Sequence, residues 1–188
     1  MIEGEIVNLR APERDDLDRL WTWINDPEVI EHLSMRYPMS REAERAWLEM
    51  QTAGPLRFFD VRFAIETKDG AQIGSIAFHR VVAEQRSATL GIMIGDKAHW
   101  SRGYGADAIR TLLRFAFDQM NLRRVDLSVD ADNARGIACY RKCGFIEEVR
   151  QRAFCFRRGT WIDGLEMGVL RPEFEVLHGV TPKEEQHA

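Results

Sequence analysis

The stretch that decides the fold is Trp100-Ser101-Arg102-Gly103-Tyr104-Gly105-Ala106. Apolar residues alternate before it as in a half-buried strand, at Leu90, Ile92 and Ile94. After it they recur on one helix face, at Ile109, Leu112, Leu113, Ala116, Phe117 and Met120. Two glycines let the backbone approach a ligand closely, and a helix start beside Arg102 favours an anion. We therefore expect a strand, a phosphate-binding loop and a helix in succession.

A second constellation runs from Asn133 to Phe145. It predicts a short helix from about Asn133 to Cys143, ended by Gly144 in a left-handed conformation. Tyr140 follows Asn133 by almost two helical turns, so both side chains lie near one face. Asn133 either caps this helix or binds a ligand amide. Tyr140 either carries a phenol into a cleft or is a half-buried core tyrosine, which is the commoner case.

The remaining patterns complete the predicted order βααβββαβαββ. They are a strand at Ile6–Leu9, helices over Leu17–Ile24 and after Ser40, a hairpin of Val61–Glu66 with Gln72–His79, a strand at Val125–Val129, and two final strands joined near Arg158-Gly159. The order predicts an α/β (α+β mixed) fold with a central mixed, mostly antiparallel sheet and helices on both faces. We expect one domain at residues 1–175 and a polar tail at residues 176–188.

Composition limits the function classes. The 188 residues are 45% hydrophobic and 30% charged with a net charge of −4, as in an ordinary globular domain that does not favour nucleic acid. No apolar run approaches the roughly 20 residues of a membrane span, and no secretory signal is visible, so we expect a cytoplasmic protein. Cys139, Cys143 and Cys155 are expected to be reduced, packed thiols, and no metal site is expected.

A dinucleotide site is the rival interpretation of the glycine loop. Gly103 to Ala108 match the G-x-G-x-x-A pattern, and Asp130 lies where a ribose-binding acid would. However, the first glycine of that pattern should follow its strand directly, whereas Gly95 to Arg102 intervene here. Too little chain remains for a doubly wound sheet, which counts against a nicotinamide or flavin cofactor.

Together the two constellations resemble the GNAT superfamily of N-acetyltransferases, from about residue 5 to about residue 170. Gly103 and Gly105 match its helix-start pattern, with Trp100 at the first position. Asn133, Tyr140, Gly144 and Phe145 match its second pattern, with Gly136 in place of alanine. The opening Asn8–Leu17 and closing Phe156–Met167 are similar to the branch of ribosomal-protein N-terminal and spermidine acetyltransferases. That branch often has an acid where this chain has Thr89.

The resemblance implies direct transfer of an acetyl group from acetyl-CoA to a primary amine. By the same resemblance, Met93, Ile94 and Gly95 would pair with the pantetheine amides like an added strand. The pyrophosphate would lie on Trp100, Ser101, Arg102, Gly103, Tyr104, Gly105 and Ala106. Asn133 and Tyr140 would contact the cofactor arm, with Tyr140 as the catalytic donor to the leaving thiolate.

The general base and the acceptor stay open at this point. Glu28, Glu31, His32 and His79 are candidate bases, although each is more often a solvated surface residue. Asp26–Met50 and Phe154–Asp163 should frame the acceptor pocket, and a protein N-terminus, polyamine, amino sugar or aminoglycoside would all suit it. A homodimer is left open. The alternative function is a non-catalytic acetyl-CoA-binding sensor or interaction module on the same fold.

Overall fold

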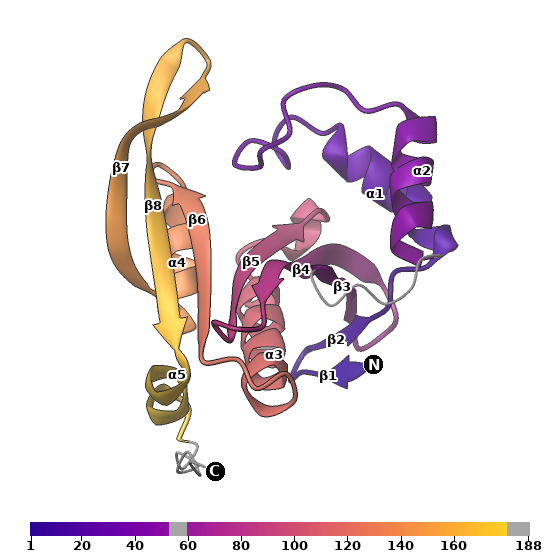
Figure 1. Ribbon diagram of the computed structural model, residues 1–188. Helices are drawn as coiled ribbons and strands as arrows, with labels where there is room; N and C mark the ends of the chain where they lie inside the picture. Colours follow the sequence, from indigo (N-terminus) through magenta and orange to yellow (C-terminus); the bar gives the residue numbers. More distant parts are fainter. Residues whose placement is uncertain (53–59, 180–188) are drawn as a thin grey trace.

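The computed structural model describes residues 1–52 and 60–179. Its strands form one sheet in the order β1-β2-β3-β4-β5-β6-β8-β7 (Figure 1). Their bounds are β1 (Ile2–Glu3), β2 (Val7–Arg10), β3 (Asp60–Thr67), β4 (Gln72–Val82), β5 (Ser87–Ile94), β6 (Arg124–Asp130), β7 (Ile146–Arg157) and β8 (Thr160–Leu170). The β5–β6 pair is parallel and the other neighbours are antiparallel, which confirms the predicted mixed sheet.

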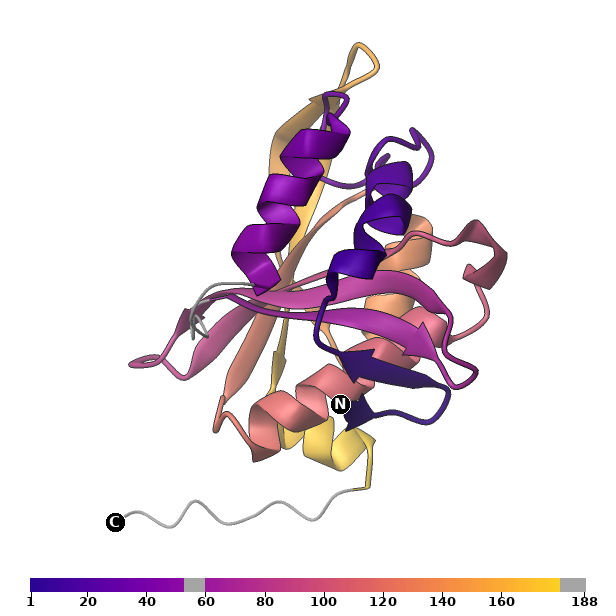
Figure 2. The ribbon, with the colours of Figure 1, turned by 90° about the vertical axis from the view of Figure 1, so that its right-hand side faces the viewer.

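Helices cover both faces of this sheet (Figure 2). They are α1 (Leu17–Ile24), α2 (Arg41–Thr52), α3 (Tyr104–Asp118), α4 (Ala134–Lys142) and α5 (Arg171–Leu177), with 3₁₀ turns η1 (Arg14–Asp16) and η2 (Lys97–His99). The pair α1 and α2 lies on the face opposite α3. No helix in the described part of the chain combines the length and apolar character that a bilayer crossing requires.

Local chemistry explains the two tight hairpins. Gly70 adopts a φ of 90° between β3 and β4, which an L side chain rarely tolerates. Arg158 and Gly159 join β7 to β8 with φ values of 51° and 78°. Two positive φ values in a two-residue loop match the twist of the flanking strands. Both predicted hairpins are therefore confirmed.

Helix α3 is the centre of the main core. Its predicted apolar face is buried at Ile109, Leu112, Leu113, Ala116 and Phe117. The helix start is also tied to the N-terminal segment, because the buried Asp107 carboxylate accepts backbone N–H bonds from Glu5, Ile6 and Val7 at 3.3, 2.8 and 3.0 Å. These bonds hold the first turn of α3, directly after the glycine loop, against the segment that leads into β2.

Two elements were not predicted, the short β1 and helix α5. Helix α5 has Pro172 in its first turn, and the Glu173 carboxylate accepts the N–H of Leu170 at 2.8 Å. Its Phe174 is buried against Phe117, with ring centroids 5.4 Å apart. The predicted boundary at residue 176 therefore falls inside α5, and the polar tail at residues 180–188 lies outside the described residues.

Candidate active site

A cleft opens where strands β5 and β6 part. The two strands pair only between Ser87–Thr89 and Arg124–Asp126, and their register ends there. Beyond that point lies a cavity of about 820 Å³, lined by β5, the end of β6, the start of α3, helix α4 and the loop before α2. Of the residues predicted for the cofactor, ten line it: Met93, Ile94, Trp100, Ser101, Gly103, Tyr104, Gly105, Ala106, Asn133 and Tyr140.

The edge of β5 that faces this cleft has no partner strand beyond Thr89, and of its backbone groups the carbonyl of Ile94 accepts a bond from the Trp100 side chain. The N–H of Gly95 donates to the carbonyl oxygen of Ile73 on β4 at 2.9 Å. Backbone N–H and C=O groups point alternately to the two sides of a strand. The backbone groups of Met93 therefore also point toward β4, whereas those of Ile92 and Ile94 point toward the cleft. The backbone groups that face the cleft are therefore those of Ile92 and Ile94, whereas those of Met93 and Gly95, which the sequence also predicted for the pantetheine, face β4.

The glycine loop meets the other end of the cavity. Gly103 precedes α3 with a φ of 89°, and Ser101 also has a positive φ of 58°. The first N–H groups of α3 have no intrahelical partner, so together with the helix dipole they favour an anion. Arg102 is exposed and does not line the cavity.

Trp100 anchors this loop in a way that its sequence position did not reveal. Its Nε1 donates to the carbonyl oxygen of Ile94 at 2.7 Å, which links the loop to the end of β5. The guanidinium carbon of Arg135 lies 3.8 Å from the centroid of the Trp100 ring. Arg135 lines the cavity and has no carboxylate within ion-pair distance among residues 1–52 and 60–179. In the sequence, only its position two residues after Asn133 could have indicated that Arg135 lies at this cavity.

Helix α4 presents Asn133 and Tyr140 to the same cavity. The side-chain oxygen of Asn133 accepts the N–H of Gly136 at 2.9 Å, so Asn133 is the N-cap, and its amide NH₂ faces outward from that bond. A Cβ on Gly136 would lie 2.6 Å from that amide nitrogen, so a larger residue here would require the Asn133 side chain to shift.

Tyr140 is held by its ring and not by its hydroxyl. The ring packs edge-on against Phe145 with centroids 6.1 Å apart. No group in the described part of the chain forms a hydrogen bond with the hydroxyl, although Tyr140 lines the cavity. Burial, with a smaller contribution from neighbouring thiols, raises the pKa of Tyr140 above its ordinary value. The phenol therefore keeps its proton throughout the physiological pH range.

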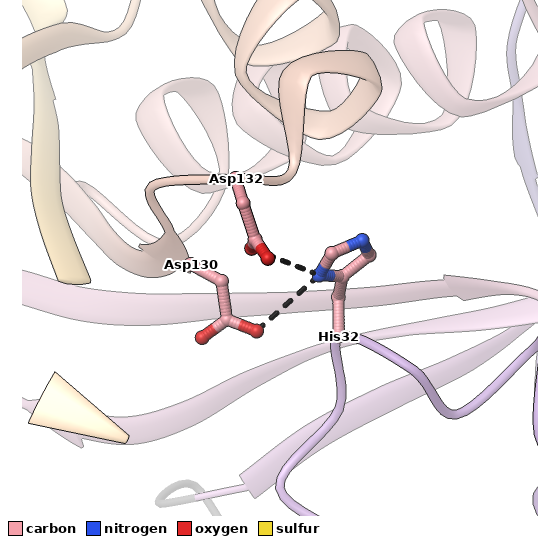
Figure 3. A group of neighbouring side chains, drawn as sticks. All are labelled: His32, Asp130 and Asp132. Atoms are coloured by element: carbon pink, nitrogen blue, oxygen red, sulfur yellow. Dashed lines mark hydrogen bonds and ion pairs between the residues drawn. The ribbon is translucent and has the colours of Figure 1, made fainter. Parts of the chain in front are cut away.

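The end of the cavity that was predicted to receive the acceptor is lined by the loop between α1 and α2 and by the β7–β8 hairpin. Asn25 closes the loop, because its side chain accepts the N–H of Met39 at 2.9 Å and donates to the Met39 carbonyl at 3.0 Å. This closure brings His32 to the cavity, where its Nδ1 lies 3.3 Å from Asp130 and 3.7 Å from Asp132 (Figure 3). Arg157 from β7 bonds to both carboxylates.

The other candidate bases lie in different surroundings. Glu28 lines the cavity but is bound by Lys97 at 3.0 Å. Glu31 is paired with Arg158 at 3.1 Å and does not line the cavity. His79 lines it from β4, with its ring against Gly91. Thr89 donates to Asp126 at 2.8 Å at the closed end of the cleft, away from Tyr140.

The sheet excludes the dinucleotide interpretation. A doubly wound fold needs several adjacent parallel strands, whereas here one pair is parallel. Asp130, the predicted ribose-binding acid, is engaged by Arg157 and His32.

Comparison with known proteins agrees with this geometry. The family model described as an acetyltransferase (GNAT) domain matches residues 7–146. The chain belongs to the GNAT acetyltransferase family. The predicted family is thus confirmed, and with it the assignment as an N-acetyltransferase. No finding supports the non-catalytic alternative.

The individual relatives include members of the predicted branch. The chain is 28% identical over 94% of its length to the SPbeta prophage-derived uncharacterized N-acetyltransferase YokL of Bacillus subtilis, covering 96% of that protein. It is 25% identical over 89% of its length to a spermidine N(1)-acetyltransferase of Vibrio cholerae, covering 95% of that protein. The crystal structure of spermidine N-acetyltransferase from Vibrio cholerae in complex with CoA and spermine has a similar fold, with a TM-score of 0.83, 23% identity, and coverage of 91% of this chain and 99% of that one.

Proposed function

We propose that this protein transfers the acetyl group of acetyl-CoA directly to a primary amine in the cleft between β5 and β6. The observation that carries the proposal is one cavity that joins an open strand edge, a helix N-terminus and the Tyr140 hydroxyl. Pantetheine amides suit the first feature, a pyrophosphate suits the second, and a leaving sulfur suits the third. Acetyl-CoA would supply the activated thioester.

The chain's own groups would mostly position and stabilise. The backbone of Ile92 and Ile94 would align the cofactor arm, and the amide of Asn133 would bind it further along. The phenol of Tyr140 would donate a hydrogen bond to the sulfur as negative charge develops there. Because burial raises the pKa of Tyr140, full loss of its proton is unfavourable, and the hydroxyl acts as a hydrogen-bond donor.

The charges at the acceptor end favour an acceptor with a single cationic amine over a polyamine. Glu28 and Asp130 are the carboxylates that line the cavity in the described part of the chain, and each is ion-paired, with Lys97 and Arg157 respectively. Several spaced carboxylates would complement the several charges of a polyamine. The acidic residues of α2, which are Glu42, Glu44 and Glu49, do not line the cavity. We therefore place a protein N-terminus or a monoamine ahead of spermidine.

Two measurements test this function. Thiol release from acetyl-CoA should occur with at least one amine in a panel of peptides, monoamines, amino sugars, aminoglycosides and spermidine, with peptides or monoamines giving the highest kcat/KM. Acetyl-CoA should raise the melting temperature because a ligand that binds only the folded state stabilises it, and NADH should not. Absence of turnover with every amine, or a thermal shift with NADH alone, would refute the proposal.

A further inference from the structure

We propose that His32 accepts the proton of the attacking amine and that Asp130 positions its ring. The inference rests on the proposed acetyltransferase function and assigns a base that the sequence left among four candidates. A primary alkyl amine is protonated at neutral pH and must lose a proton before it attacks a thioester. The proton acceptor must therefore line the same cavity as Tyr140, as His32 does.

The hydrogen bonds around Arg157 decide which nitrogen of His32 is free. One terminal nitrogen of Arg157 donates to Asp130 at 2.5 Å and to the carbonyl oxygen of Glu31 at 2.7 Å. These two bonds use both of its hydrogen atoms. Its 3.3 Å approach to Nδ1 of His32 therefore supplies no hydrogen, and Nδ1 itself must donate to Asp130.

This tautomer leaves a lone pair on Nε2 of His32. Figure 3 shows Nδ1 turned toward both carboxylates and the second nitrogen on the far side of the ring. No residue in ranges 1–52 and 60–179 forms a hydrogen bond with Nε2. A carboxylate hydrogen-bonded to a histidine fixes the tautomer and the orientation of the ring, as in other acid–base sites.

The charge balance of the cluster suits a proton acceptor better than a metal ligand set. His32, Asp130 and Asp132 lie close enough together to hold a metal ion. However, the guanidinium of Arg157 already occupies both carboxylates, at 2.5 and 2.6 Å. Two carboxylates, one guanidinium and a neutral imidazole carry a net charge of −1, so proton uptake by His32 brings the cluster to neutrality.

Each proton in the reaction has a destination. Nε2 of His32 takes one proton from the ammonium group, which frees the lone pair that forms the C–N bond. As the C–S bond breaks, a second proton leaves the nitrogen and ends on the CoA sulfur, which Tyr140 stabilises by a hydrogen bond. The third proton stays on the product amide. His32 then releases its proton to solvent.

The variant His32→Asn distinguishes the roles of the two ring nitrogens. The Asn amide nitrogen can occupy the place of Nδ1 and keep the bond to Asp130, whereas Nε2 is lost. With the best alkyl amine, kcat/KM should fall by about 100-fold, within the usual range for general base catalysis. With the β,β,β-trifluorinated analogue of that amine, whose three fluorines withdraw enough electron density to leave the nitrogen mostly unprotonated at neutral pH, the variant should lose less than about threefold. The affinity for acetyl-CoA, measured by calorimetry, should be unchanged.

The same change at His178, a histidine outside the cavity after α5, is the control and should leave both amines unaffected. An equal loss with both amines would make His32 a structural residue and overturn the proposal. Wild-type kcat/KM in His32→Asn, with the loss found in His79→Asn instead, would also overturn it. If the wild-type protein acetylates no amine, the proposed function itself is refuted. If the wild type is active, a negative result with His32→Asn refutes only the role of His32.

Discussion

Replacement of Tyr140 by Phe tests the chemistry most directly. The hydroxyl has no hydrogen-bond partner among the described residues, and the ring contact with Phe145 is kept. The variant should therefore unfold with a free energy within about 1 kcal/mol of wild type. A hydrogen bond to a charged acceptor contributes about 1.5–3 kcal/mol, and each 1.36 kcal/mol is about tenfold in rate. We expect kcat to fall about 10- to 150-fold.

The assay is steady-state thiol release with the best amine, beside a urea denaturation curve and calorimetry with acetyl-CoA. Affinity for acetyl-CoA should change little, because the bond strengthens mainly as the sulfur gains charge. Tyr37→Phe is the matched control, since Tyr37 is 83% exposed and does not line the cavity. A Tyr140→Phe enzyme that folds normally and keeps the wild-type kcat would refute the role of the hydroxyl.

Three further predictions concern the cofactor loop and its support. Gly105→Val should weaken acetyl-CoA binding at least about tenfold in calorimetry because its side chain would fill the pyrophosphate site, and unchanged affinity in a folded variant would place that site elsewhere. Arg135→Gln should raise the Kd of acetyl-CoA about tenfold but not that of acetyl-pantetheine, since the lost cation lines the cavity beside the proposed pyrophosphate loop; equal effects would contradict this. Asp107→Ala should lower the free energy of unfolding by about 2–4 kcal/mol in urea, because it leaves the buried N–H of Val7 without its acceptor, and a loss below about 1 kcal/mol would contradict that account.

Turns and helix faces were predictable because their causes are local. The Asp69-Gly70 turn depends on the φ that glycine tolerates, and the apolar stripe of α3 follows from a 3.6-residue period. Helix α5 was missed because seven residues give too short a period to recognise, and it is stabilised by Phe174 packing on Phe117, far away in the sequence.

The placement of the glycine loop and of helix α4 was foreseeable for the same reason. The glycine loop and the pair Asn133 and Tyr140 each belong to one continuous segment, so spacing alone brings them to one helix start or one helix face. The direction of the β5 backbone was not foreseeable in this way. Pairing with β4 decides which backbone groups of β5 point toward the cleft. They are those of Ile92 and Ile94, and not those of Met93.

The acceptor side was decided by tertiary structure alone. Nothing near His32 in the sequence distinguishes it from Glu28 or Glu31, because its partner Asp130 lies 98 residues later. Loop closure, the end of β6 and the β7–β8 hairpin bring His32, Asp130 and Arg157 together. Sequence patterns report periodicity and backbone preference within a segment, whereas a hydrogen-bonded cluster depends on where separate segments meet once the sheet has formed.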